Sequence, residues 1–311
     1  MSLPVIYSAI PQYFGGKRAL LPFVFNPLKS VIPQSEWQQL RFIDAFRGGG
    51  IVSLYAKSVG FAEVISNDIS LRSEVVAKAL LENNHTKIQP YDLMDFLSLC
   101  QLKPGHVETR YAGQVFSLRH ARRLDQLRGY IESIQCPAKQ ALFRLLLWKL
   151  TSRYVAYGTS IGISNKGCAR ALDSGDYHKL TAKRLIDGSF ERLLKPSVSD
   201  IKGLADGIND GIFPALGTVK SYKLDWNEGR GGFVLGSTGQ TLRELLAGTE
   251  AVTWQFDSAS GLKHACAYQA AAMQPRISIF RVSARESSMG PPPRGGAAEP
   301  TIEVLWDEGI F

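Results

Sequence analysis

Near its amino terminus the chain carries residue types that suit the binding of a nucleotide-like ligand. Tyr13 and Phe14 precede two glycines and Lys17, and three further glycines occupy positions 48–50. A glycine lets the backbone pass close to a ligand that a Cβ atom would exclude. A lysine ammonium offers a charge to an anionic group. Together these segments predict a site in which the backbone lies directly beneath a bound molecule.

Two acidic residues, Asp44 and Asp68, end short apolar stretches on either side of the second glycine run. An acid that ends the second strand of an α/β unit is well placed to accept hydrogen bonds from ribose hydroxyls. The alternative is that the glycines only make a tight turn and that Asp68 caps the following helix. The dinucleotide fingerprint Gly-x-Gly-x-x-Gly is not met, because Ile51-Val52-Ser53 follows the glycines. A phosphate-binding P-loop around Lys17 is also absent.

The segments around these residues alternate between strand and helix patterns. Residues 41–46 and 63–68 are short and apolar, as buried strands are, and 51–57 fits a helix that begins directly after the glycines. Residues 71–82 continue as a helix with one apolar face. A strand, a glycine turn, a helix and a second strand predict a βαβ unit, and hence a parallel sheet in an α/β fold.

The pattern changes twice along the rest of the chain. From about 91 to 205 it is helical, with period-3.6 apolar spacing at 91–99, 114–134 and 138–152. Strand patterns then return at 219–224, 232–235, 251–256, 276–282 and 301–306. The economical organisation is one α/β domain formed by residues 1–85 and 206–311, interrupted by a helical insert at 86–205.

Composition narrows the classes of protein that fit. The 45% hydrophobic content predicts a packed core, and no apolar run approaches the roughly 20 residues that span a bilayer. The start of the chain lacks the pattern of a secretory signal, and the four cysteines show no metal-ligand spacing. We therefore expect a reduced, cytoplasmic protein without a metal or a membrane partner. The net charge of +8 favours a polyanionic partner.

From Tyr13 to Ile69 the chain resembles the Dam-type (alpha-class) DNA adenine N6-methyltransferases, including the phage enzymes. The motifs that carry the resemblance are, in order, Tyr13-Phe14-Gly15-Gly16-Lys17, Phe42-Ile43-Asp44-Ala45-Phe46-Arg47-Gly48-Gly49-Gly50 and Asn67-Asp68-Ile69. A looser likeness continues through residues 153–167, similar to the family's target-recognition region, and through the last two strand patterns, similar to its closing hairpin. The resemblance implies a Rossmann-like methyltransferase sheet with a helical insert domain.

The same resemblance implies that the cofactor is S-adenosylmethionine. Tyr13 and Lys17 would contact its methionine part, the glycines would pass beneath it, and Asp68 would hold its ribose. Asp225, which ends a later strand pattern, either faces the adenine ring of the cofactor or is a loop acid. The full set expected to hold the cofactor is Tyr13, Gly15, Lys17, Asp44, Phe46, Gly48, Gly49, Gly50, Asp68 and Asp225.

The catalytic motif of the family is missing. Members carry Asp-Pro-Pro-Tyr or a close variant, whose acid and proline carbonyl accept hydrogen bonds from the adenine amine while the aromatic ring stacks on the flipped base. No such tetrapeptide occurs in the sequence. Two positions are candidates for a remnant of this motif. At Gly236 the acid would have been lost, whereas the segment at Asp257 keeps an acid but has no prolines. We favour the segment before Asp257 as the family's fifth strand, which leaves the catalytic residues unknown.

The helical insert is rich in arginine and lysine, which suits the neutralisation of DNA phosphates. Arg119, Arg122 and Arg123 fall within about one helical turn and are expected to act together. Arg153, Lys166 and Arg170 bracket a glycine-rich loop where a reader of base edges could sit. These six residues are the predicted contacts to double-stranded DNA, and an ordinary solvated helix surface is the alternative.

Three hypotheses of function follow. The first is an S-adenosylmethionine-dependent DNA adenine N6-methyltransferase with a divergent site, of the kind found in restriction–modification systems. The second is a catalytically silent homologue that binds DNA as a recognition or regulatory subunit, and whether a partner subunit restores the missing residues is left open. The third is a phage or mobile-element enzyme that modifies bases by other chemistry on the same scaffold. The oligomeric state and the recognition sequence are left open.

Overall fold

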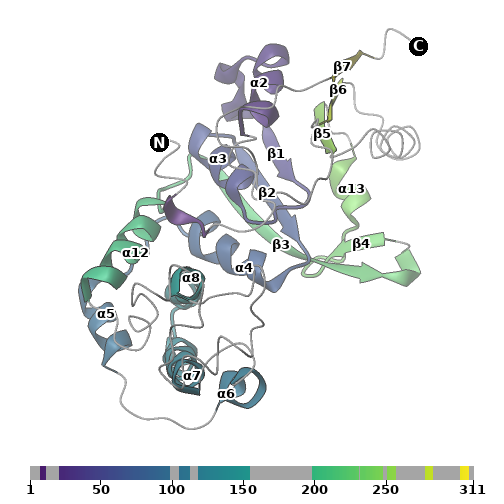
Figure 1. Cartoon of the computed structure of the whole chain (residues 1–311). Helices are drawn as coiled ribbons and strands as arrows, with labels where there is room; N and C mark the ends of the chain where they lie inside the picture. The colour runs from purple at the N-terminus through teal and green to yellow at the C-terminus, as the bar shows by residue number, and fades with distance from the viewer. Residues whose placement is uncertain are drawn as a thin grey trace. The chain divides into compact units, whose positions relative to one another are not determined.

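The computed structural model describes a large part of the chain (Figure 1): residues 8–11, 21–98, 105–112, 118–154, 198–230, 232–247, 251–256, 277–282 and 302–307. The chain divides into two compact units. The first comprises residues 1–18 and 38–223, and the second comprises 19–37 and 224–311. The helices of the expected insert thus share a unit with the first two strands. The division into a cofactor domain and a recognition insert stays a prediction.

A parallel sheet forms the first part of the fold. Strand β1 (Arg41–Asp44) pairs in parallel with β2 (Glu63–Asp68), and β2 pairs in parallel with the first half of β3 (Thr218–Asn227). Helix α3 (Ile51–Val59) connects β1 to β2 and ends at Gly60, whose φ of 89° suits a glycine at that position. The predicted βαβ unit at residues 41–68 is confirmed.

The helices that follow β1 and β2 cover the same face of this sheet. Asp44, Ser66 and Ser221 are register partners and therefore share a face. Asp44 accepts a hydrogen bond from Ser53 of α3, and Ser221 donates to Glu82, which follows the helices after β2. Those helices are α4 (Leu71–Val76) and the π-helical turn η3 (Ala77–Leu81).

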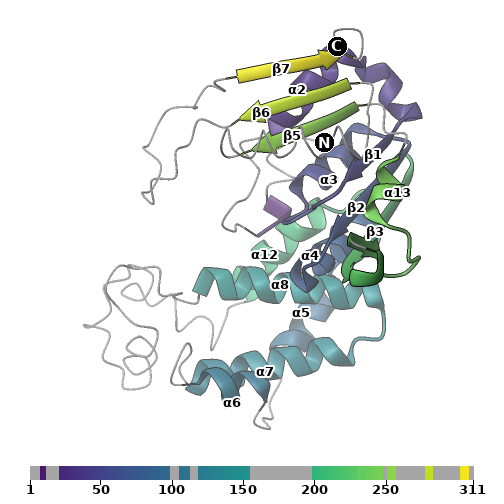
Figure 2. The same ribbon diagram turned by 90° about the vertical axis from the view of Figure 1, so that its right-hand side faces the viewer.

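A layer of further helices lies in the same unit, and it packs on α4 and η3 through α8 (Figures 1 and 2). It consists of α5 (Pro90–Leu97), α6 (His106–Tyr111), α7 (Leu118–Ser133), α8 (Pro137–Tyr154) and α12 (Val198–Asp210). Helix α8 contacts η3, α4, α7 and α12. The aromatic rings of Phe96, Tyr130 and Phe143 join α5, α7 and α8, with centroids 5.2 to 5.7 Å apart. The helices expected at 91–99, 114–134 and 138–152 are thus present, with shifted ends.

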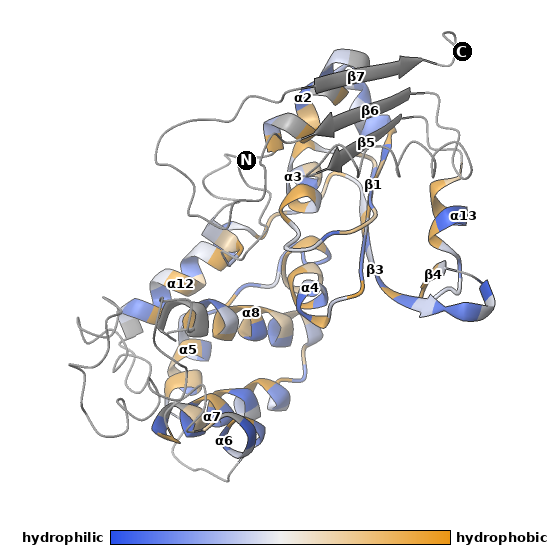
Figure 3. Cartoon of the chain, turned by 45° about the vertical axis from the view of Figure 1, so that its right-hand side comes forward, coloured by the Kyte–Doolittle hydropathy of each residue, from blue (hydrophilic) through white to orange (hydrophobic). Residues whose placement is uncertain are grey.

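Sequence patterns explain where these helices begin and which face they bury. Pro90 opens α5, and the side chains of Gln89 and Asp92 cap its first turn reciprocally. In α7, Leu124, Leu127 and Ile131 are buried while the other side is hydrophilic, so both colours alternate along this helix in Figure 3. No helix among the described residues is both long enough and apolar enough to cross a membrane.

The second unit contains one helix near the amino terminus and the later strands. Helix α2 (Leu21–Val31) is followed by the short helix η2 (Gln34–Gln39), and the ring of Phe25 packs against Trp37. The second half of β3 forms an antiparallel pair with β4 (Gly232–Leu235), after which comes α13 (Leu242–Leu246).

A separate three-stranded sheet lies in the same unit. It contains β5 (Ala251–Phe256), β6 (Ile277–Val282) and β7 (Ile302–Asp307) (Figure 2). Strand β6 pairs in parallel with β5 and antiparallel with β7. The predicted strands at 251–256, 276–282 and 301–306 are therefore confirmed, and the last two form the expected antiparallel pair.

A buried lysine links α3 to the end of η3. Lys57 is 3% exposed, and its Nζ donates to the carbonyl oxygens of Leu80 and Asn83, each at 2.9 Å. The ammonium also lies 4.9 Å from the ring centroid of Phe213. Burial lowers the pKa of Lys57 from 10.5 to about 8, because removing an ammonium from water penalises its charged form.

Lys57 is expected to make the stability of the protein increase with pH between about 8 and 10.5. In this window the unfolded chain still binds the proton that the folded chain has lost, so the free energy of unfolding rises with pH. The gain should be about 1–3 kcal/mol, because the two carbonyl bonds offset part of the desolvation. Urea unfolding at pH 7.5 and pH 10 measures it. The difference between wild type and Lys57→Met isolates this group, and a wild type that loses stability relative to the variant at pH 10 would contradict the assignment.

Candidate functional site

The glycine run after β1 forms a loop that other residues could not form without strain. Gly48 has a φ of 54° and Gly50 a φ of 79°, both in the left-handed region. A Cβ atom on Gly50 would lie 2.8 Å from Cγ1 of Val76 on α4. The loop therefore needs glycine both for its backbone angles and for the close approach of α4.

The carboxylate of Asp68 holds this loop against the end of β2. Its Oδ2 accepts a hydrogen bond from the backbone N–H of Gly48 at 2.7 Å, and its Oδ1 accepts from the N–H of Ser70 at 2.8 Å. The side chain is 9% exposed. Each carboxylate oxygen has a further lone pair, so Asp68 can fix the loop and still accept from a ligand hydroxyl. It is not a simple helix cap, because one of its two bonds crosses to the glycine loop.

Asp44 ends the neighbouring strand, so the two acids lie at the same edge of the parallel sheet. Its Oδ2 accepts a hydrogen bond from the Ser53 hydroxyl of α3 at 2.5 Å, and the residue is half-buried. The predicted pair of strand-end acids, Asp44 and Asp68, is thus brought together with Gly48 and Gly50. Gly49 is buried in the same loop.

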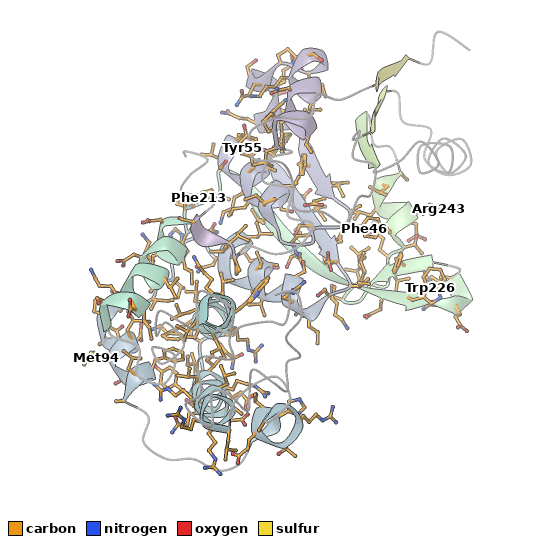
Figure 4. The ribbon with its side chains drawn as sticks, viewed as in Figure 1. Phe46, Tyr55, Met94, Phe213, Trp226 and Arg243 are labelled. Carbon is orange, nitrogen blue, oxygen red and sulfur yellow. The ribbon has the colours of Figure 1, made fainter. Side chains whose placement is uncertain are left out.

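Large apolar side chains flank the acids and face solvent. Phe46 follows β1, whereas Ile69 and Leu71 follow β2, and their exposed fractions are 59%, 57% and 68%. Figure 4 labels Phe46 where the chain leaves β1. We call these three residues the apolar rim. Exposed apolar groups beside buried acids suit a ligand with an apolar ring and polar hydroxyls. Of the three, only Phe46 was predicted.

The sequence did not predict a role for two polar side chains at this site, those of Arg47 and Asn67. Arg47 is 4% exposed and bonds to Ser66 and Ser73, although an arginine within a glycine turn is usually solvated. Asn67 is 0% exposed, and neither its Oδ1 nor its Nδ2 has a hydrogen-bond partner among the described residues. The Asn67 amide therefore has donor and acceptor capacity that this part of the structure leaves unused.

In the described structure the remaining predicted residues lie on elements other than β1, β2 and the glycine loop. Asp225 is exposed in the half of β3 that belongs to the second unit, and Gly236 lies in the turn after β4. Strand β4 runs antiparallel to β3, so Gly236 ends a hairpin strand and not a strand of the parallel series that carries Asp44 and Asp68. Six predicted residues lie outside the described ranges: Tyr13, Gly15, Lys17, Lys166, Arg170 and Asp257.

The three arginines of α7 do not share one exposed face. Arg119 and Arg122 are exposed, and Arg122 forms an ion pair with Glu108 of α6 at 3.0 Å. Arg123 is only 9% exposed, and its guanidinium donates to the carbonyl oxygen of Leu97. The expectation that Arg123 contacts DNA is wrong for this conformation, because the helix turns it toward the protein interior. Arg153 belongs to the last turn of α8.

The fold and the site define a class of protein. A parallel βαβ unit with a glycine loop, two strand-end acids and an exposed apolar rim is the arrangement with which α/β proteins bind nucleotide-like ligands at the carboxyl edge of a sheet.

Comparison with known proteins finds one matching family over the first part of the chain. The sequence model of the D12 class N6 adenine-specific DNA methyltransferases matches residues 13–158, which include both glycine segments, Asp44 and Asp68. The predicted resemblance to DNA adenine methyltransferases is confirmed over these residues.

Two relatives carry names of the same kind. The chain is 31% identical over 136 residues to the modification methylase StsI of Streptococcus sanguinis, and this match covers 39% of this chain and 20% of that protein. It is 32% identical over 114 residues to the type II methyltransferase M2.HphI of Haemophilus parahaemolyticus, covering 37% of this chain and 33% of that protein. The matches thus span a third or less of each relative. No solved structure matches the chain significantly.

Proposed function

We propose that the protein is a Rossmann-like, S-adenosylmethionine-dependent methyltransferase that acts on the N6 amine of adenine in double-stranded DNA. The single observation that carries the proposal is the Asp68 carboxylate, fixed between the glycine loop and the start of α4 at a sheet edge that also holds Asp44. The similarity of residues 13–158 to the D12 class N6 adenine-specific DNA methyltransferases supports this reaction type.

The residues at this edge fit the cofactor in four respects. Asp68 has lone pairs for the ribose hydroxyls, and the apolar rim offers a surface for the adenine ring. The glycine loop packs closely on α4, in a conformation that a side chain on Gly50 would distort. The unused amide of Asn67 adds a donor and an acceptor next to Asp68. When bound, S-adenosylmethionine supplies an electrophilic methyl group on a positively charged sulfur, which the nearby acids also favour.

By resemblance, Tyr13 and Lys17 would hold the methionine part of the cofactor. An ammonium beside a carboxylate is a chemically sound pairing, and these residues precede the loop in the order that the family requires. Asp225 is proposed as a contact to the adenine ring. For both assignments the test is calorimetry with S-adenosylhomocysteine on Lys17→Ala and Asp225→Asn, in which each variant should bind more weakly than wild type.

A second candidate function is that of a catalytically silent homologue that recognises DNA for a partner subunit. The observation that favours it is the absence of Asp-Pro-Pro-Tyr from the sequence. Loss of one preorganised acceptor for the adenine amine typically lowers the rate by about 10²–10³. Retention of the glycine loop and of Asp68 is consistent with either function, because both use the cofactor pocket.

Methyl transfer separates the two candidates. Unmethylated double-stranded DNA is incubated with the protein and labelled S-adenosylmethionine, and the DNA is then digested to nucleosides. We expect labelled N6-methyl-2′-deoxyadenosine above the level given by an Asp68→Asn control. Bound cofactor without any labelled nucleoside would instead establish the silent homologue.

The exposed arginines of α7 are proposed as phosphate contacts. If Arg119 and Arg122 each neutralise one phosphate, the double substitution to glutamine should reduce the slope of log affinity against log salt by about 2. Fluorescence anisotropy with a DNA duplex at several salt concentrations measures this slope. Lys78→Gln removes an exposed cation of η3 and is the control. An unchanged slope in the double variant would remove α7 from the DNA interface.

A further inference from the structure

Arg47 is a buried cation that ties the glycine loop to two other elements. Its backbone N–H donates to the carbonyl oxygen of Asn67 at 2.7 Å. Its Nη1 donates to the carbonyl oxygen and the hydroxyl of Ser66, at 3.1 and 2.7 Å, and its Nε donates to the hydroxyl of Ser73 at 2.8 Å. One side chain therefore joins the loop to β2 and to α4.

These bonds extend to Gly48 and, through it, to Asp68. The hydroxyl that accepts from Arg47, that of Ser73, donates to the carbonyl oxygen of Gly48 at 2.6 Å. The N–H of Gly48 donates to Asp68. The N–H and the C=O of Gly48, which belong to the peptide groups on either side of its Cα atom, are thus both fixed: the C=O by the chain of bonds that begins at Arg47 and the N–H by Asp68. A change in the backbone angles of Gly48 would therefore disturb its bond to Asp68 Oδ2.

The surroundings of the guanidinium are unusual for a buried charge. Within the described structure all of its hydrogen bonds go to neutral acceptors, and it forms no ion pair there. Burial lowers the pKa of Arg47, and the more distant charges of Asp68 and Asp44 raise it again. A buried ion is weak support for stability, since apolar replacements are often neutral. The rigid, forked geometry of arginine is what these contacts use.

We propose that Arg47 is a positioning residue, which sets the backbone of Gly48 and through it the Asp68 carboxylate for the cofactor without touching the cofactor itself. The inference rests on the proposed function for the ligand, whereas the linkage from Arg47 to Gly48 stands on the free protein. A lysine cannot replace Arg47, because a single ammonium cannot reach the Ser66 carbonyl and the Ser73 hydroxyl in the same fork.

Calorimetric titration with S-adenosylhomocysteine tests the effect on binding. Arg47→Met and Arg47→Lys are both expected to bind about 10- to 100-fold more weakly than wild type, as when a supporting contact behind a ligand site is lost. Lys57→Met is the matched control, because it also removes a buried cation but leaves the loop untouched, and its affinity should stay within about twofold of wild type. Wild-type affinity in Arg47→Lys would overturn the proposal.

Hydrogen exchange of the Gly48 amide tests the same linkage without any ligand. The exchange rate of this amide should increase in Arg47→Met and, to a smaller extent, in Ser66→Ala, and it should not change in Lys57→Met. Ser66→Ala removes only one acceptor, so it answers the question even if Arg47→Met fails to fold. Unchanged exchange in Ser66→Ala and Arg47→Lys would overturn the linkage. If exchange at Gly48 is faster in these variants but the wild type binds no S-adenosylhomocysteine, the linkage stands and only the cofactor assignment is contradicted.

Discussion

Asp68→Asn is expected to weaken the binding of S-adenosylhomocysteine about 10- to 100-fold and to lower the free energy of unfolding by about 1–3 kcal/mol. Both carboxylate oxygens accept backbone N–H groups, from Gly48 and Ser70. An asparagine has one oxygen, so one of these N–H groups would face an amide donor. The ribose would also lose a charged acceptor, which gives stronger hydrogen bonds than a neutral one.

Calorimetry and urea unfolding measure the two effects of Asp68→Asn separately. Asp95→Asn is the matched control, because Asp95 is an exposed acid on α5 whose carboxylate makes no hydrogen bond to the residues that the structure describes. The control should retain both affinity and stability. A variant at Asp68 that binds S-adenosylhomocysteine as wild type does would show that this carboxylate serves the fold alone.

Gly50→Ala is expected to lower the free energy of unfolding by about 2–4 kcal/mol. Gly50 has a φ of 79°, where an L-residue with a Cβ atom is strained by about 1–2 kcal/mol. The new Cβ atom would also meet Cγ1 of Val76 at 2.8 Å, so α4 would have to shift. Because Ser73 of α4 bonds to Gly48, this shift should reach the loop and weaken cofactor binding as well.

Gly129→Ala is a control that should raise the free energy of unfolding, whereas Gly50→Ala should lower it. Gly129 lies inside α7, and nothing lies within 4 Å of a Cβ atom built on it. Alanine is favoured over glycine in a helix interior, so this change should stabilise the protein by about 0.5–1 kcal/mol. Urea unfolding of the two variants measures the difference. Equal stability of Gly50→Ala and wild type would mean that the loop does not hold the backbone angles described above.

The order of strands and helices in the first unit could be predicted because local patterns and tertiary packing agree there. Glycines follow β1, an acid ends β2, and the helices after residue 90 have a clear apolar face. Helix α2 was not predicted, because Pro22 and Pro27 lie within it and proline in a sequence indicates a break. Strand β3 extends beyond its predicted end because its second half pairs with β4.

At the site, the acids and glycines could be predicted because an acid at the end of a strand and a run of glycines before a helix each have few possible roles. Arg47 and Ser73 could not, because a buried arginine with neutral partners has no pattern in the sequence that distinguishes it from a surface residue. Arg123 was misassigned because it was grouped with its neighbours, although it precedes the buried Leu127 by about one helical turn and shares its side of α7.

Titration of the wild-type protein with S-adenosylhomocysteine, followed by calorimetry, tests the central claim most directly. The loop at residues 47–50 and the carboxylate of Asp68 are preformed in the structure, so one molecule should bind per chain with a measurable heat. Prior binding should also slow hydrogen exchange at Gly48 and Ser70, whose amides hold that carboxylate. No heat and no protection at these two amides, in a protein shown to be folded, would contradict the assignment of this sheet edge as the cofactor site.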